Sequence, residues 1–123
     1  MRREERLTKP QQYALVYNKG SAWACNLIVM KALPNNLDIS RYGFSVSKRV
    51  GKAVVRNRVK RLLREILRVV PVKPAWDIIF IARPSVAAAD YSSLKSSVED
   101  LLSRAGLMKA EEENLLAKSQ RFS

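Results

Sequence analysis

The segment from Ala53 to Val69 constrains the fold most, because it can form one long helix with two opposed faces. At 100° per residue its apolar side chains fall on a single stripe, which predicts a helix packed on a core. The stripe consists of Val55, Val59, Leu62, Leu63, Ile66 and Leu67. Basic residues recur at every fourth position on the opposite side, from Lys52 to Arg68. A helix of this length spans roughly 25 Å, so the segment predicts a rigid rod with a ladder of cations in solvent.

The positive charge of the chain is concentrated around this helix. The segment 41–68 carries ten Lys or Arg and one acid, Glu65, whereas the rest of the chain carries thirteen bases and ten acids. Such a field attracts a polyanion, because each phosphate that is neutralised releases condensed counterions. Arginine predominates, and its planar fork can bond two phosphate oxygens at once. The pattern favours nucleic acid over a solvated face, which usually carries acids between its bases.

The N-terminal part predicts a helix followed by strands. Thr8 and Gln11 have the spacing of a capping box, so a helix is expected to start there and to stop near Gly20. The segment 23–33 is rich in β-forming residues, and 34–36 predicts a turn. Apolar residues alternate with small polar ones over 42–48, which is typical of a half-buried strand.

The C-terminal part predicts one more strand and one more helix. Prolines at 71 and 74 end the basic helix, and the nearly continuous apolar run 76–82 predicts an interior strand. Asp90 is a suitable N-cap for a last helix. The inward residues of that helix are Tyr91, Leu94, Val98, Leu101, Leu102 and Ala105. The order helix, three strands, helix, strand, helix predicts a two-layer α/β sandwich with a mixed sheet. We expect one nucleic-acid-binding domain over 1–107 and a mobile tail over 108–123, which includes the acidic run 111–113.

The composition argues against a catalytic site built by this chain alone. The chain has no histidine, the commonest general acid or base, and its carboxylates are scattered outside the run 111–113. The single cysteine, Cys25, excludes an internal disulfide and is expected to be a small buried hydrophobe in a cytoplasmic protein. No apolar run is long enough for a membrane span or a secretory signal. These features predict a binding protein whose partner supplies the catalysis.

One set of motifs resembles a known family. The run Phe44-Ser-Val-Ser-Lys-Arg-Val-Gly51 is followed by Arg56-Asn57-Arg58, with Lys60, Arg61 and Arg64 beyond it. At this spacing, on a basic amphipathic helix, the run resembles the signature of the bacterial ribonuclease P protein subunit. The resemblance covers about residues 5–107. It implies a ribosomal protein S5 domain 2-like fold with a left-handed strand–helix–strand crossover, although right-handed crossovers are the general rule.

The resemblance also implies partners. In that family the catalytic subunit is an RNA that removes the 5′ leader of precursor tRNA by magnesium-dependent hydrolysis, and the protein binds both RNAs. The implied partners are therefore ribonuclease P RNA and precursor tRNA, with Mg²⁺ held mainly by the RNA and no small-molecule substrate. The residues implied to contact the catalytic RNA are Lys48, Arg49, Lys52, Arg56, Asn57, Arg58, Lys60, Arg61, Arg64 and Arg68. For Asn57, a local cap or turn partner at the helix start is the alternative.

Tyr13 and Tyr17 match the two aromatic residues that line the family's leader-binding cleft. They lie four residues apart on one helix face, so they could stack on single-stranded RNA, or one ring could pack in the core. Lys31 stands where relatives often carry a further aromatic residue, which implies an ionic contact with the leader. Composition and charge alone leave two other functions open: a structural RNA-binding protein, such as a ribosomal protein, and a DNA-compacting protein.

Overall fold

The computed structural model describes residues 1–109, and every predicted helix and strand is present in that range. The elements are α1 (Pro10–Lys19), β1 (Ser21–Ala24), β2 (Ile28–Pro34), β3 (Arg41–Ser45), α2 (Ala53–Val69), β4 (Trp76–Ala82) and α3 (Tyr91–Arg104). Two short 3-10 helices, η1 (Arg3–Glu5) and η2 (Pro84–Ala88), precede α1 and α3. The bounds of α2 and β4 are those predicted, whereas β3 ends at Ser45 because residues 46–52 form a turn.

The start of α1 differs from the predicted capping box. Gln12, and not Gln11, reaches back over the helix end: its Oε1 accepts hydrogen bonds from the backbone N–H of Thr8 and of Lys9, both at 3.0 Å. The predicted box is therefore wrong by one residue. The N-cap position is occupied by Lys9, whose side chain makes no capping bond, so Gln12 provides the side-chain capping at this helix end. The predicted cap of α3 is confirmed, since Asp90 Oδ1 accepts from the Ser93 N–H at 2.8 Å.

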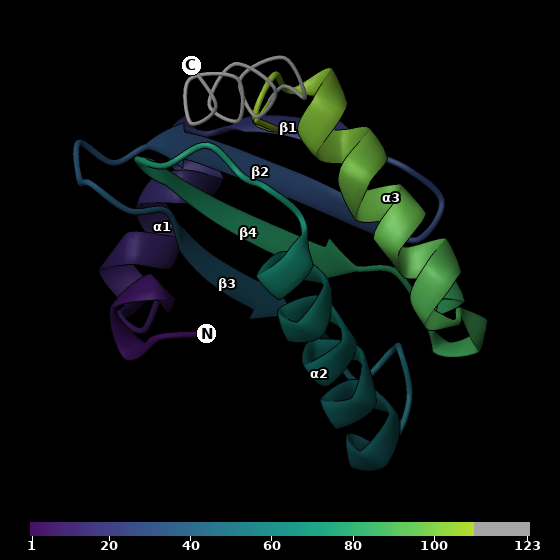
Figure 1. The fold of residues 1–123 in the computed structure, drawn as a ribbon. Coiled ribbons are helices and arrows are strands. Elements are labelled where there is room, and N and C mark those ends of the chain that lie inside the picture. Colours follow the sequence, from purple (N-terminus) through teal and green to yellow (C-terminus); the bar gives the residue numbers. More distant parts are fainter. Residues whose placement is uncertain (110–123) are drawn as a thin grey trace, which may run out of the picture.

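The four strands form one mixed sheet in the order β1-β2-β4-β3 (Figure 1). β2 pairs antiparallel with β1 and β4, and β3 pairs parallel with β4. The interior position predicted for β4 is confirmed, and five of its seven residues are buried because helices cover both of its faces. β3 is left at one edge of the sheet.

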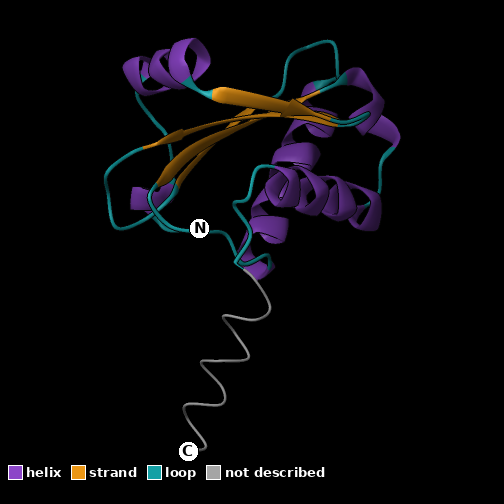
Figure 2. Ribbon diagram, turned by 90° about the horizontal axis from the view of Figure 1, so that it is seen from above, coloured by secondary structure: helices purple, strands orange, loops and turns teal. Residues whose placement is uncertain are grey.

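The helices lie on opposite faces of this sheet. α1 covers one face, and α2 and α3 lie side by side on the other (Figure 2). β3 and β4 are parallel neighbours joined through α2. In Figure 1, α2 lies in front of the sheet, both strands run toward the lower right, and β4 lies above β3. When the view is turned so that both strands point upward, β4 lies to the left of β3, so the crossover is left-handed. This is the rare hand that the resemblance implied.

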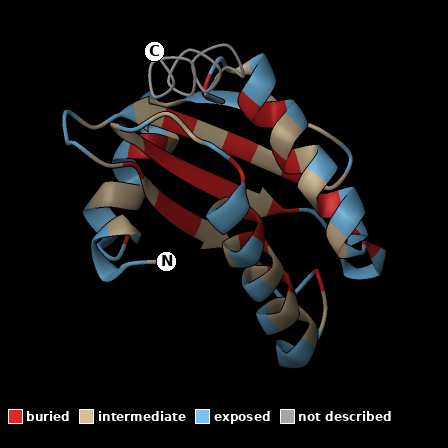
Figure 3. Ribbon diagram, in the orientation of Figure 1, coloured by how far each residue is buried: buried red, intermediate tan, exposed pale blue. Residues whose placement is uncertain are grey.

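The alternation of β4 side chains supplies two cores. Ile78 and Phe80 face α2 and α3, where they join the main core, and Ile79 faces α1 in a smaller core with Leu7 and Val16. Figure 3 shows the buried positions concentrated on the two inner strands and on the inner faces of α2 and α3. The predicted stripe of α2 is confirmed. Val59, Leu63 and Ile66 are fully buried, and the other three residues of the stripe are half-buried against the core. The sequence predicted a buried Cys25, but this residue is only half-buried, because it lies in the turn that joins the edge strand β1 to β2.

A buried polar cluster holds the connection between β2 and β3. Asp77 of β4 is nearly inaccessible and accepts two hydrogen bonds from Arg41, at 2.8 and 2.7 Å, and one from Asn35 Nδ2 at 2.9 Å. These bonds raise the pKa of Arg41 above its ordinary value. The charge of Arg41 is therefore neutralised within the fold and does not belong to the basic surface that follows it in sequence.

The described chain ends against the connection between α2 and β4. Leu107 is buried, Met108 forms an isolated bridge with Val72, and the Lys109 N–H donates to the Pro71 carbonyl at 3.0 Å. The rest of the predicted tail, residues 110–123 with its acidic run, lies outside the described residues. None of the helices over 1–109 combines the length and the apolar character needed to cross a membrane.

Candidate nucleic-acid interface

The cations of the basic face of α2 are not paired with acids of the described fold. Over residues 1–109, none of the Lys or Arg side chains from 48 to 68 forms an ion pair. The exposed members are Lys48, Arg49, Lys52, Asn57, Arg61 and Arg68, and the partly buried ones are Arg56, Arg58, Lys60 and Arg64. The field of the face is therefore not neutralised within the described fold, as binding of a polyanion requires.

The turn before α2 places Lys48 and Arg49 at the start of this face. Val50 is buried and its N–H donates to the Ser47 carbonyl at 3.1 Å, so the turn is anchored to the core at its centre. Gly51 has a φ of 151°, a conformation that side chains other than hydrogen rarely allow. The turn reverses the chain from β3 into α2 within a few residues. Both cations thereby stay exposed beside the first turn of the helix.

Two arginines of the face are partly withdrawn from solvent. Arg58 Nη2 donates to the Ala89 carbonyl at 2.7 Å, which ties α2 to the segment that leads into α3. Arg58 flanks the ladder of cations and was expected to point to solvent, and that expectation is therefore wrong. Arg56 Nε is buried without a hydrogen-bond partner in the described fold, so this part of the guanidinium is shielded from solvent.

Asn57 lies on the outer surface of α2. Its side chain makes no hydrogen bond with any described residue, and the helix begins four residues before it, so the alternative of a local cap has no support. With Val54, Arg58, Arg61 and Arg64 it lines a shallow hollow of about 550 Å³. An amide among cations can combine shaped hydrogen bonds with phosphate contacts.

The tyrosines of α1 lie across the other face of the sheet. α1 crosses the strands, so Tyr13 lies over Gly43 of β3, whereas Tyr17 lies beside Lys31 of β2. A Cβ atom at position 43 would approach the Tyr13 ring to 2.7 Å, so only glycine allows the ring to lie in this position. Both rings are half-buried and pack against the small core under α1. Burial, helped by the neighbouring Tyr17 phenol, raises the pKa of Tyr13 above its ordinary value.

Lys31 contacts Tyr17 in two ways. Its Nζ donates to the Tyr17 carbonyl at 3.1 Å and lies 5.4 Å from the centre of the Tyr17 ring. The carbonyl is one of the last in α1, and the ammonium group of Lys31 satisfies it, as a lysine near the C-terminus of a helix often does. The structure thus brings together Lys31 and Tyr17, and the lysine holds the position of the ring as well as carrying charge beside it.

Beside these tyrosines, three half-buried side chains of the sheet form the floor of the surface that α1 leaves partly open. Val29, Ile81 and Ser45 lie in one row across β2, β4 and β3, on the face that α1 covers. All three are half-buried, and Ile81 packs against the core that Tyr13 and Tyr17 join. Sequence reasoning missed these floor residues, because only the strand pairing shows that they form one row.

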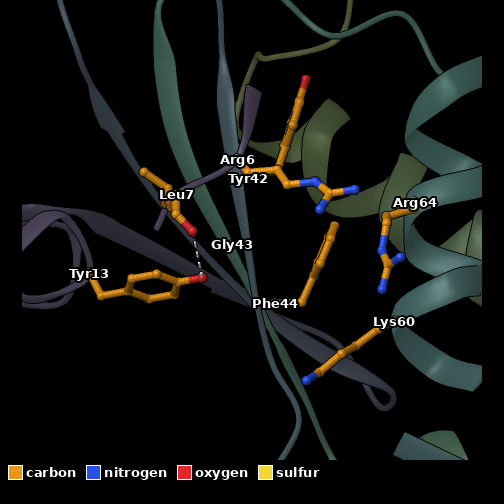
Figure 4. A pocket seen from close by; sticks show the side chains of 8 residues that line it. All are labelled: Arg6, Leu7, Tyr13, Tyr42, Gly43, Phe44, Lys60 and Arg64. Carbon is orange, nitrogen blue, oxygen red and sulfur yellow. Dashed lines mark hydrogen bonds between the residues drawn. The ribbon is translucent and has the colours of Figure 1, made fainter. Parts of the chain in front are cut away.

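A single hollow joins the two predicted sites. Tyr13 of α1 and Lys60 and Arg64 of α2 line the same cavity of about 170 Å³ around the edge strand β3 (Figure 4). Its other lining residues are Arg6, Leu7, Tyr42, Gly43 and Phe44. Sequence reasoning missed Arg6, which lies in a mixed-charge start of the chain, and it assigned Phe44 to the core because of the strand alternation.

Comparison with known proteins shows the family of this chain. The family model described as Ribonuclease P matches residues 1–106. The chain belongs to the ribonuclease P protein family. It is 44% identical over 119 residues to the ribonuclease P protein component of Dehalococcoides mccartyi strain CBDB1, covering 97% of this chain and 99% of the relative. Among solved structures it is similar to the RNase P protein of Staphylococcus aureus, with a TM-score of 0.78, 33% identity and coverage of 85% of this chain and 98% of that one. The RNase P protein of Thermotoga maritima gives a TM-score of 0.72 at 30% identity, over 81% and 96% of the two chains.

Membership of the ribonuclease P family decides between the functions that the charge pattern left open. The chain is a component of an RNA-processing ribonuclease and has an RNA partner. The family therefore supports the main interpretation over a ribosomal or DNA-compacting role. In the described part of the chain no three His, Cys, Asp or Glu side chains gather in the manner of a metal site.

Proposed function

We propose that this protein binds the catalytic RNA of ribonuclease P through the basic face of α2, and the 5′ leader of precursor tRNA through the cleft beside α1. The RNA would perform the magnesium-dependent hydrolysis and hold most of the Mg²⁺. The protein would contribute cations that lower the repulsion between two polyanions, and aromatic rings that hold a single strand.

The observation that carries this proposal is the shared hollow. Tyr13, a candidate for stacking on the leader, lines the same cavity as Lys60 and Arg64 of the basic face. A leader held against α1 would therefore lie next to an RNA held against α2. This adjacency is what a subunit that aligns a substrate with a catalytic RNA requires.

Reconstitution with ribonuclease P RNA tests the proposal. The protein should raise the affinity of the RNA for precursor tRNA that carries a leader more than its affinity for mature tRNA. The double variant Lys60→Gln/Arg64→Gln should bind the RNA less tightly, and the fall of log affinity with log salt should become shallower by about 0.7–0.9 for each lost phosphate contact.

Two outcomes would contradict the proposal. Equal enhancement for both tRNAs would remove the leader contact from the function. Preferential capture of ribosomal RNA over ribonuclease P RNA, measured by competition at fixed salt, would favour a structural role in another particle.

A further inference from the structure

The first residues of the chain form a strap along the free edge of β3. We call residues 3–7 the N-terminal strap. Arg6 forms a parallel bridge with Tyr42, and the Leu7 N–H donates to the Tyr42 carbonyl at 2.9 Å. The Leu7 side chain is buried in the small core under α1, and its carbonyl accepts a hydrogen bond from the Tyr13 hydroxyl at 3.3 Å. The strap is thus held from both sides, and Arg6 has a defined place at the edge of the sheet.

This place brings Arg6 to the basic face of α2. Arg6, Lys60 and Arg64 line one hollow, and their charged ends are drawn around the ring of Phe44 in Figure 4. No acid lines the hollow, and none of the three cations forms an ion pair with a residue of the described range. Phe44 is held from behind by Phe80, with ring centres 6.4 Å apart and planes inclined by 24°.

Three like charges around one hollow repel one another, and an anion between them removes that repulsion. Two of the three are guanidinium groups, whose forks match the oxygens of a phosphate. A half-buried aromatic ring in the middle can support a ribose or a base, as rings do in single-strand sites. At about 170 Å³ the hollow has room for a phosphate group and not for a duplex.

The geometry points to a seat for a single RNA phosphate, formed by Arg6 of the strap with Lys60 and Arg64 of α2, and with Phe44 under the adjoining nucleotide. This inference rests on the proposed function and adds the strap to its interface. The phosphate could belong to the catalytic RNA, or to the leader where it passes from Tyr13 toward α2. The chemistry is the same for both sources, and the test distinguishes them.

The test compares Arg6→Gln with Arg3→Gln in the full chain. Arg3 is an exposed cation of the same strap that does not line the seat, so its variant removes the same charge elsewhere. One arm measures the affinity of each protein for ribonuclease P RNA over a range of salt. The other arm measures the affinity of the assembled holoenzyme for precursor tRNA with a leader and for mature tRNA.

We expect Arg6→Gln to lower one of these affinities roughly tenfold, the low end for losing a hydrogen bond to a charged group. The salt slope in the same arm should become shallower by about 0.7–0.9, and Arg3→Gln should change neither quantity appreciably. A loss in the first arm assigns the phosphate to the catalytic RNA, and a loss for leader-bearing precursor alone assigns it to the leader. Arg6→Lys should restore the salt slope but only part of the affinity, because an ammonium group lacks the fork.

Equal behaviour of Arg6→Gln and Arg3→Gln in both arms would overturn the seat, whether both match the wild type or both lose affinity to the same extent. The wild-type protein separates this result from failure of the proposed function. If wild type binds ribonuclease P RNA normally, only the seat is lost; if it does not bind that RNA, the proposed function falls and the seat with it.

Discussion

At the scale of single residues, the two tyrosines of α1 differ in what their hydroxyl groups do. The Tyr13 hydroxyl donates to the Leu7 carbonyl, whereas no hydrogen bond of the Tyr17 hydroxyl is present in the described fold. We expect Tyr13→Ala and Tyr17→Ala to weaken holoenzyme binding of leader-bearing precursor by about 1–3 kcal/mol each, the worth of one stacked base. Mature tRNA should bind as before.

Phenylalanine at these two positions separates the ring from the hydroxyl. Tyr17→Phe should restore the affinity for leader-bearing precursor fully, because the ring makes the stack. Tyr13→Phe should restore the stack but loosen the strap, at a cost in folding free energy of about 0.5–1.5 kcal/mol, measured by urea unfolding. An equal loss for leader-bearing and mature tRNA in the alanine variants would instead place both rings in a purely structural role.

Tyr42 gives the fold a dependence on alkaline pH. Its side chain is 7% exposed, and burial, followed by the charge of Glu5, raises its pKa from 10.0 to about 12. Below pH 10 both the folded and the unfolded chain keep the phenol proton, so the contribution of Tyr42 to the free energy of unfolding is fully present. Between about pH 10 and 12 the unfolded chain loses this proton first, so the free energy of unfolding falls. Over this window the loss amounts to roughly 3 kcal/mol.

The variant Tyr42→Phe isolates this contribution from the other titratable groups of the chain. Its free energy of unfolding should fall less than that of the wild type between pH 9 and 12, when both are measured in urea. Parallel pH profiles for the two proteins would show that the Tyr42 phenol is not responsible.

At the scale of one element, the cations of α2 differ in whether they bond within the fold. Arg61 is exposed and forms no ion pair with an acid of the described range, whereas Arg58 donates to the Ala89 carbonyl. We expect Arg61→Ala to weaken binding to ribonuclease P RNA with an unchanged melting temperature. Arg58→Ala should weaken the same binding and also destabilise the fold by about 1–2 kcal/mol, because a charge-assisted hydrogen bond is lost. Thermal unfolding and salt titrations on both variants check this division, and equal melting temperatures would contradict it.

At the scale of the whole molecule, we expect the protein purified without RNA to cleave nothing. Hydrolysis of a phosphodiester needs an activated water and stabilisation of the leaving oxygen, commonly by two metal ions about 4 Å apart. The chain has no histidine to act as a general base, and its acids do not converge in sequence outside the run 111–113. Ribonuclease P RNA can supply phosphate oxygens for Mg²⁺.

The order of addition tests this division of labour. Protein, precursor tRNA and Mg²⁺ are mixed first, and ribonuclease P RNA is added second. Cleavage at the mature 5′ end should begin only with the second addition. Cleavage before it, from a preparation shown to be free of RNA, would assign the chemistry to the protein.

Much of the fold was predictable because its signals are local. The bounds of α2 and β4 follow from an apolar stripe and an apolar run that are complete within each segment, and the cap at Asp90 follows from one side chain. The cap of α1 was misplaced by one residue because Gln11 and Gln12 are equivalent in sequence, and only the helix start chooses between them. The cations of α2 and the tyrosines of α1 were named in advance, but their proximity was not, and Arg6 was missed.

The sequence by itself determined that this chain would carry a basic rod on an α/β core, because periodicity and charge are properties of neighbouring residues. The tertiary structure decided what lies beside the rod. It turned Arg41 inward to Asp77, bonded Arg58 to Ala89, and brought Arg6 to Lys60 and Arg64. These outcomes depend on strand order, on the left-handed crossover and on the strap along β3. Each is set by packing between segments far apart in the chain, about which a local pattern carries no information.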